Sequence, residues 1–170
     1  MTSLILTIIG PDRPGLVEHL SNTIAEHDGN WLESALSRLG GKFAGILVIS
    51  VPDEKASDLT DALQTLQKSG LKIIAETADE QERPSTLQPF TLELIGHDKP
   101  GIVREISQAL AKRHINVENL TTELISGSMS AELLFKAEAQ LLAPDNIDFD
   151  DLQSAIEAIA SDLMVDITLN

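Results

Sequence analysis

The sequence predicts an α+β protein in which one small unit is built twice, and three observations support this. The stretch "IGPDRPGLV" at residues 9–17 returns as "IGHDKPGIV" at residues 95–103, with the two copies 86 residues apart (96 − 10). Both copies stand in the same order of strand-like and helix-like patterns. The polar stretch "ADEQERPST" separates them. We therefore expect a first domain over residues 1–77, a linker over 78–87 and a second domain over 88–170.

Each unit opens with a short aliphatic run, "SLILTIIG" in the first and "FTLELIG" in the second, which indicates a strand. After the repeated turn, apolar residues such as Val17, Leu20 and Ile24 recur at helical spacing. Pro14 and Pro100 fit the first helical position, where the missing N–H of proline costs nothing. A strand, a turn and a helix are therefore expected at the start of each unit.

A hairpin, a helix and a strand complete the unit. The runs "NWLESALSRL" and "FAGILVISV" flank Gly40-Gly41, which is a hairpin signal. Asp53 is expected to cap a helix carrying Leu59 and Leu63, and "LKIIAET" supplies the closing strand. The second unit repeats this order with "NVENLTTEL", "SAELLFKAEA", a helix over residues 152–159 and "MVDITL". The resulting order β-α-β-β-α-β is the ferredoxin-like split arrangement.

The two copies differ in length. Gly41 and Leu47 match Gly127 and Leu133 at the offset of 86, whereas Leu59 aligns with Leu152 at 93, so about seven residues are expected to be inserted within "KAEAQLLAPDNIDF". A unit of about 80 residues has a marginal core by itself. We therefore expect the two ferredoxin-like units to be packed together, which would bury apolar surface and cover open sheet edges.

Composition and charge argue against several functions. The chain has no cysteine, which removes disulfides, thiolate zinc sites and cysteine nucleophiles, and its four histidines show no metal spacing. Neither a metal nor a cofactor is expected. A net charge of −15 repels the phosphate backbone, so we predict no direct DNA binding. No secretory signal or membrane-length apolar run is recognisable, which favours a cytoplasmic protein without membrane contact.

The repeated turn is the candidate functional site. A strand ends at Gly10 or Gly96 and a helix follows, so free N–H groups and the helix dipole favour a carboxylate there. Gly15 and Gly101 lack a Cβ and allow close approach, and an aspartate stands nearby for an ammonium. The turn could therefore bind a zwitterion. A purely structural interpretation competes with this one, because aspartate is a routine N-cap and glycine a routine turn residue.

Two other functions fit less well. An enzyme would need a catalytic pair such as Asp12 with His19, but the second copy has Glu105 at the position of His19, so no enzyme is expected. The same element order serves RNA-binding modules, which stack bases on strand aromatics in a basic setting. Phe43 and Phe135 lie on candidate strands but form no such cluster, and the charge has the wrong sign.

The strand, the motif "G-x-D-x-P-G-[LI]-V", the helix and the asparagine that opens the next strand resemble the ACT domain, a small regulatory module that commonly binds amino acids. This resemblance covers essentially the whole chain. It implies two sets of ligand-binding residues: Asp12, Pro14, Gly15, Leu16, Val17 and Asn30 in the first unit, and Asp98, Pro100, Gly101, Ile102, Val103 and Asn116 in the second.

Two ACT units with no further domain resemble the glycine cleavage system transcriptional repressor group. That resemblance implies a non-enzymatic regulatory protein that senses a small amino acid, glycine above all. It would repress transcription by binding a DNA-binding activator of the glycine cleavage operon. Association of the chain into a homo-oligomer is compatible with this function. The alternative is an amino-acid-sensing regulatory subunit that controls a metabolic enzyme.

Overall fold

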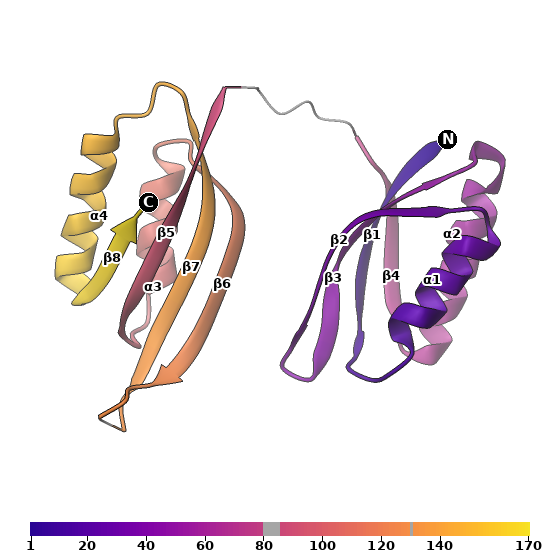
Figure 1. Ribbon diagram of the computed structural model, residues 1–170, viewed down its shortest axis with the longest axis horizontal. Helices are drawn as coiled ribbons and strands as arrows, with labels where there is room; N and C mark the ends of the chain where they lie inside the picture. Colours follow the sequence, from indigo (N-terminus) through magenta and orange to yellow (C-terminus); the bar gives the residue numbers. More distant parts are fainter. Residues whose placement is uncertain (80–85, 130) are drawn as a thin grey trace. The chain divides into compact units, whose positions relative to one another are not determined.

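The computed structural model describes residues 1–79, 86–129 and 131–170, which form two compact units, Met1–Gln81 and Glu82–Asn170 (Figure 1). The predicted linker over 78–87 falls mostly outside the described residues. The last strand of the first unit ends at Thr77, and the first strand of the second unit begins at Leu87. The packing of the two units against each other stays a prediction.

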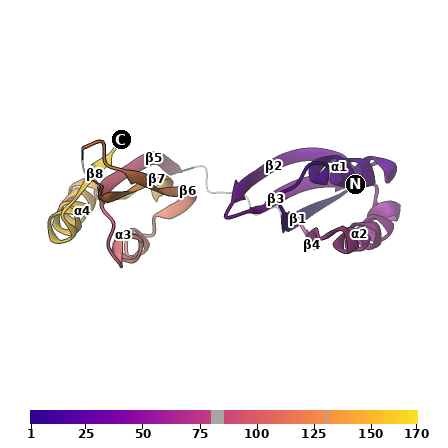
Figure 2. The ribbon, with the colours of Figure 1, turned by 90° about the horizontal axis from the view of Figure 1, so that it is seen from below.

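The first unit has the predicted order of elements. These are β1 (Thr2–Pro11), α1 (Leu16–Glu26), β2 (Asn30–Leu39), β3 (Lys42–Val51), the 3₁₀ turn η1 (Asp53–Lys55), α2 (Ala56–Thr65), the 3₁₀ turn η2 (Leu66–Ser69) and β4 (Lys72–Thr77). The four strands form an antiparallel sheet in the order β2-β3-β1-β4. Both helices cover the same face of that sheet (Figures 1 and 2). The ferredoxin-like prediction is confirmed for this unit.

The second unit repeats the arrangement. Its elements are β5 (Leu87–His97), α3 (Ile102–Ala111), β6 (Asn116–Ser126), β7 (Leu133–Pro144), α4 (Phe149–Leu163) and β8 (Val165–Leu169). The sheet order β6-β7-β5-β8 is the counterpart of the first. Here too both helices lie on one face of the sheet, and the other face has no helix of this unit. The sequence-derived fold class, α+β with two βαββαβ units, is therefore confirmed.

Alternation of burial along the central strands explains why the helices bind one face only. Leu4, Leu6 and Ile8 of β1 are buried against the helices, whereas the residues between them point to the open face. Leu20 of α1 and Leu59 of α2 lie in the same core. Each unit has such an aliphatic core of its own. A period of two on the strands and of three to four on the helices therefore specifies this two-layer packing.

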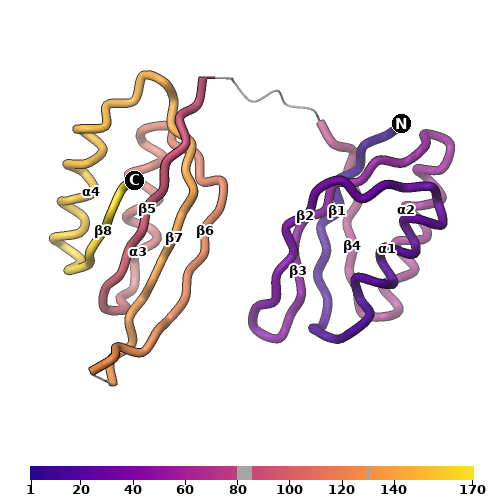
Figure 3. The backbone as a smooth tube through the Cα atoms, in the orientation of Figure 1, coloured from indigo at the N-terminus to yellow at the C-terminus, as the bar shows by residue number. Residues whose placement is uncertain are grey.

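The insertion in the second unit lies in its hairpin, and the predicted position is wrong for most of it. Leu6 pairs with Leu47 in the first unit, and the equivalent Leu92 pairs with Ala139 in the second. The offset is thus 86 on the first strand (92 − 6) but already 92 on the third (139 − 47), so six residues were added within the β6–β7 hairpin. This hairpin reaches beyond the other strands of its unit (Figure 3).

Asp53 does not cap α2, contrary to expectation. A 3₁₀ turn precedes that helix and its side chains provide no cap. The Asp53 carboxylate instead accepts a hydrogen bond from Thr2 Oγ1 at 2.7 Å and lies 3.0 Å from the N-terminal ammonium. Both contacts hold the pKa of Asp53 below its ordinary value, the hydrogen bond from Thr2 most of all. Asp53 therefore anchors the start of β1.

Candidate functional site

The repeated motif forms the same tight turn in both units. Gly15 has φ 90° and ψ −6°, and Gly101 has φ 96° and ψ −4°. A proline followed by a residue with positive φ is the signature of a type II turn, in which glycine occupies the third position. The helices consequently begin at Leu16 and Ile102. The prediction that proline is the first helical residue is wrong, because a left-handed glycine cannot be part of an α-helix.

Neither aspartate of the motif caps its helix, so the N-cap part of the competing structural interpretation is wrong, whereas both glycines do occupy turn positions as that interpretation expects. Gly15 and Gly101 stand at the N-cap positions, and neither helix start has a side-chain cap. The carboxylate of Asp12 forms an ion pair with the guanidinium of Arg38 on β2. Within residues 1–79, 86–129 and 131–170, the carboxylate of Asp98 has neither a hydrogen-bond nor an ion-pair partner. Asp98 is therefore available to a ligand.

The helix starts present backbone donors. The carbonyl of Gly15 accepts the first helical hydrogen bond, from His19 N at 2.9 Å, and that of Gly101 accepts from Glu105 N at 3.0 Å. The N–H groups of the first turn have no such acceptor inside a helix. A Cβ built on Gly15 would meet no atom within 4 Å, so the surface over the turn is open. Both turns can therefore accept an anionic group at the helix start.

The charges around the two turns differ. A shallow hollow at the first turn is lined by Asp12, Arg13, Glu18 and Phe43 among others. The hollow at the second turn lies between the turn and α4, and it includes Arg104. Arg104 stands where the first unit has Glu18 (104 − 86 = 18), so the first turn of α3 has a cation at this position, next to Glu105, where α1 has an acid. The sequence shows this reversal, but the resemblance-based site set did not contain Arg104.

The structure does not bring Asn30 and Asn116 to the turns of their own units, so that part of the predicted sites is wrong within one unit. Asn30 pairs with Ser50, which pairs with Ser3, whereas Gly10 lies at the opposite end of β1. Seven residues of strand separate Ser3 from Gly10, or about 23 Å. Helix α1 carries the chain back along the sheet before β2 begins.

The second unit shows the same separation. Asn116 pairs with Leu142 and thereby with Pro89, seven residues before Gly96. Its side-chain amide donates to Glu118 Oε1. Of the predicted site residues, Asp12, Pro14, Gly15, Leu16 and Val17 line one hollow at the first turn. In the second unit Pro100 and Gly101 line the hollow at the turn, Asp98 lies two residues before Pro100, and Ile102 and Val103 line a separate apolar hollow.

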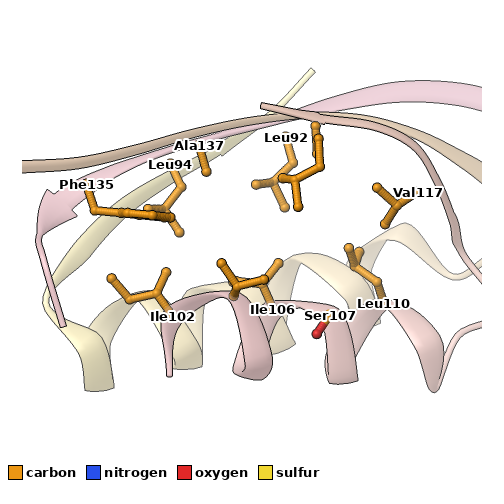
Figure 4. A pocket seen from close by; sticks show the side chains of 12 residues that line it. Leu92, Leu94, Ile102, Ile106, Ser107, Leu110, Val117, Phe135 and Ala137 are labelled. Carbon is orange, nitrogen blue, oxygen red and sulfur yellow. The ribbon is translucent and has the colours of Figure 1, made fainter. Parts of the chain in front are cut away.

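A separate apolar hollow of about 410 Å³, partly open to solvent, lies between α3 and the sheet of the second unit (Figure 4). Its lining is aliphatic or aromatic except for Ser107, whose hydroxyl donates to the carbonyl of Arg104 at 3.1 Å. Two of its lining residues are smaller than their counterparts in the first unit: Ala139 stands where that unit has Leu47, and Val117 where it has Trp31. The hollow offers no charged partner for a zwitterion, although Ile102 and Val103 of the predicted second site contribute to its lining.

The catalytic pair considered above, possible metal ligands and possible membrane spans can each be described for the ranges 1–79, 86–129 and 131–170. There, Asp12 and His19 form no hydrogen bond, because Asp12 contacts Arg38 and His19 is exposed on α1. No cluster of three or more possible metal ligands occurs in residues 1–79, 86–129 and 131–170. In the same part of the chain, no helix combines the length and apolar character that a membrane span requires.

Comparison with known proteins identifies the family. Models of the ACT domain match residues 2–75 and residues 90–135, the second ending within β7. The chain therefore belongs to the ACT domain family and is a tandem ACT-domain protein. A curated relative, the glycine cleavage system transcriptional repressor of Escherichia coli, is 22% identical over 98% of this chain and 88% of its own length.

Solved structures show the same fold over the whole chain. A protein of unknown function from Galdieria sulphuraria is 25% identical with a TM-score of 0.85, over 99% of this chain and 97% of its own. A candidate glycine cleavage system transcriptional repressor has a TM-score of 0.70 at 20% identity, over 99% and 96% of the two chains. The two ACT domains and the similarity to the curated repressor support a regulatory role.

Proposed function

We propose that this protein is a non-enzymatic regulator that senses glycine and represses transcription by binding a DNA-binding activator of the glycine cleavage operon. The similarity to a curated repressor along 98% of the chain supports this assignment. The net charge of −15 supports an indirect mechanism, because the protein's own surface repels nucleic acid. The ligand would bind at the type II turn, and the partner would recognise the resulting state of the protein.

The second turn is the better site for an amino acid, and the observation that carries the proposal is the unpaired carboxylate of Asp98 beside the start of α3. Among the described residues, the carboxylate of Asp98 has no hydrogen-bond or ion-pair partner, so it can accept hydrogen bonds from an ammonium group. The first-turn N–H groups of α3 and the guanidinium of Arg104 suit a carboxylate. Arg104 also contacts Glu105 Oε1 at 3.0 Å, an exposed pair that a ligand can replace at little cost.

The first turn is less suited to the same ligand. Its Asp12 is already paired with Arg38, and an ammonium would have to compete with that guanidinium. Glu18 replaces the cation of the second unit and opposes a carboxylate at the helix start. We therefore assign glycine to the turn at Gly101 and expect one high-affinity site in each chain.

Calorimetric titration with glycine tests the ligand assignment. Asp98→Ala should weaken binding by about 1.5–3 kcal/mol, because it removes one hydrogen bond to a charged group. Arg104→Glu, which installs the residue of the first unit, should weaken it further by repelling the carboxylate. Asn116→Ala is the matched control and should leave the affinity unchanged, because Asn116 lies at the other end of the sheet. Equal losses in Asp98→Ala and Asn116→Ala would contradict the site.

The regulatory step would be a linkage between ligand and partner. Glycine can change the activator's affinity only if it binds the partner-competent state differently from the other state. The activator must then change the glycine affinity by the same factor. Titrating glycine with and without the activator measures this factor, and a factor of one would exclude glycine as the signal. Recovery of a metabolic enzyme instead of a DNA-binding protein from the native cell extract would favour the alternative, a sensing subunit of that enzyme.

A further inference from the structure

The face of the first sheet that points away from the helices of its own unit carries a continuous apolar surface. The strands β2, β3, β1 and β4 each contribute one residue to a row across the sheet, in which each residue pairs with the next: Ala35–Ile46–Thr7–Ile74. Ile46 is 52% exposed and Ile74 is 61% exposed. We call this surface the open face of unit 1 and define it by six residues: Ile5, Ile9, Ala44, Ile46, Val48 and Ile74.

The fold does not require these apolar residues, because the second unit folds with polar ones in their places. The strand registers place Glu138 at the position of Ile46 and Thr168 at that of Ile74. Ala44 and Val48 correspond to Lys136 and Gln140, and Ile5 to Thr91; Ile9 alone has an apolar counterpart, Ile95. The apolar character of unit 1 is therefore specific to that unit, and an exposed surface of this kind is typical of a protein contact.

The open face of unit 1 is complementary to itself. Lys72 and Glu76 lie on β4 on either side of Ile74, with their side chains on the same face. Neither forms an ion pair within the described part of the chain. A two-fold axis along the row that contains Ile46 would place the strands of two copies antiparallel. Ile46 and Ile74 would then each face their own copies, Ile9 would face Ile5, and Lys72 would face Glu76 twice.

We propose that two copies of this chain associate through the open face of unit 1, stacked sheet on sheet about this two-fold axis. Sheets that pack face to face keep their strands roughly aligned, which the antiparallel arrangement satisfies. A two-fold contact of one surface with itself is the commonest form of homodimer. The dimer contact would thus be apolar in the centre, with two Lys72–Glu76 ion pairs at its rim.

The corresponding face of the second unit would not form such a contact. It carries Glu93, Glu123, Glu138 and Asp166 with one cation, Lys136, for a net charge of −3. Lys136 Nζ is already engaged by Glu138 Oε1 at 2.8 Å. Stacking this face on its own copy would bring like charges together, which disfavours association. The proposal is therefore specific to one unit.

Sedimentation equilibrium of the full chain tests the proposal. The wild-type protein should have twice the mass of one chain. Ile46→Glu should have the mass of one chain, because two carboxylates would meet on the axis, and its dissociation constant should rise on the order of a hundredfold or more. The fold tolerates glutamate there, as Glu138 shows. Leu133→Glu, at a residue 51% exposed in the second unit, is the matched control and should stay dimeric.

A charge exchange tests the orientation of the two copies. Lys72→Glu should weaken the dimer, since it would place two carboxylates opposite each other, and the double variant Lys72→Glu with Glu76→Lys should restore it. If Ile46→Glu alters the circular dichroism spectrum, Ile74→Thr serves in its place, because Thr168 occupies that position in the second unit. A monomeric wild-type protein, an undisturbed mass in the Ile46→Glu variant or failure of the double variant to recover the dimer would each overturn the proposal.

The test is independent of the proposed regulatory function. Glycine affinity should be the same in wild-type protein and in Ile46→Glu, because the open face and the turn at Gly101 belong to different units. If the wild-type protein is monomeric and Ile46→Glu instead loses the transcriptional activator, the face serves that partner and the dimer proposal is wrong.

Discussion

Replacement of Gly15 by alanine isolates the contribution of the type II turn. Gly15 has φ 90°, a conformation that residues with a Cβ adopt only at a cost, and no atom lies within 4 Å of the added Cβ. The expected destabilisation therefore comes from the backbone alone and contains no steric overlap with neighbours.

The magnitude follows from two opposing effects. A left-handed conformation costs an L-residue about 1–2 kcal/mol relative to the right-handed one. Alanine also restricts the unfolded chain, which returns about 0.4–1 kcal/mol. We expect the free energy of unfolding of the first unit to fall by about 1 kcal/mol, or roughly 4–8 °C in melting temperature for a domain of this size.

Trp31 provides an assay that reports on the first unit alone. It is the chain's one tryptophan, it packs against the core of the first unit, and its indole N–H donates to Ser34 Oγ at 3.2 Å. Its fluorescence during denaturation should therefore follow the unfolding of that unit. Circular dichroism follows both units together.

Gly101→Ala is the matched control, because its glycine has nearly the same φ, 96°, in the other unit. It should lower the stability seen by circular dichroism and leave the Trp31 transition in place. An unchanged Trp31 transition in Gly15→Ala would refute the argument that the turn requires glycine. An equal shift in both variants would instead mean that the two units unfold as one.

Three further predictions concern the core, the acid limit and nucleic acid. Leu47→Ala should lower the free energy of unfolding of the first unit by about 3 kcal/mol, whereas Leu39→Ala, at a residue 82% exposed, should change it by less than about 0.5 kcal/mol; denaturation followed by Trp31 fluorescence distinguishes them. The pKa of Asp28 lies below its ordinary value of 3.8 because Lys55 donates a hydrogen bond to its carboxylate. The stability that this contact adds is therefore present above pH 3.8 and is lost as the pH falls through the lowered pKa. In Lys55→Met, carboxyl NMR titration should show the pKa of Asp28 return towards its ordinary value. Gel shifts with the purified protein and duplex DNA should show no complex at physiological salt, and sequence-specific binding would disprove the indirect mechanism.

Local patterns in the sequence were sufficient for the fold and for the turn. The alternation along β1 and the helical spacing of Leu20 and Ile24 each depend on neighbouring residues and describe the structure correctly, and the Pro-Gly pair marks the turn, although its proline is not the first helical residue. The repetition of the motif then doubled the evidence for the architecture. Element type and turn chemistry are local properties, which explains why they could be read without coordinates.

Properties that depend on the register between strands were not accessible in the same way. Asn30 follows the turn closely along the chain, but the 11 residues of α1 carry it to the other end of the sheet. Gly127 matches Gly41 at a constant offset, yet the hairpin that contains Gly127 is six residues longer. A single shared glycine carries little information about register. Only the pairing of β6 with β7 places the insertion.

The exchange of Leu47 for Ala139 also bears on how the chain avoids misassembly. Tandem units of one ancestry can swap equivalent strands during folding. If β7 replaced β3 in the first unit, an alanine would leave a cavity where a fully buried leucine belongs; if β3 replaced β7, a leucine would enter the hollow beside α3. The two cores thus distinguish their own strands by volume. Correct pairing is favoured at the stage when the strands dock, before any ligand or partner binds.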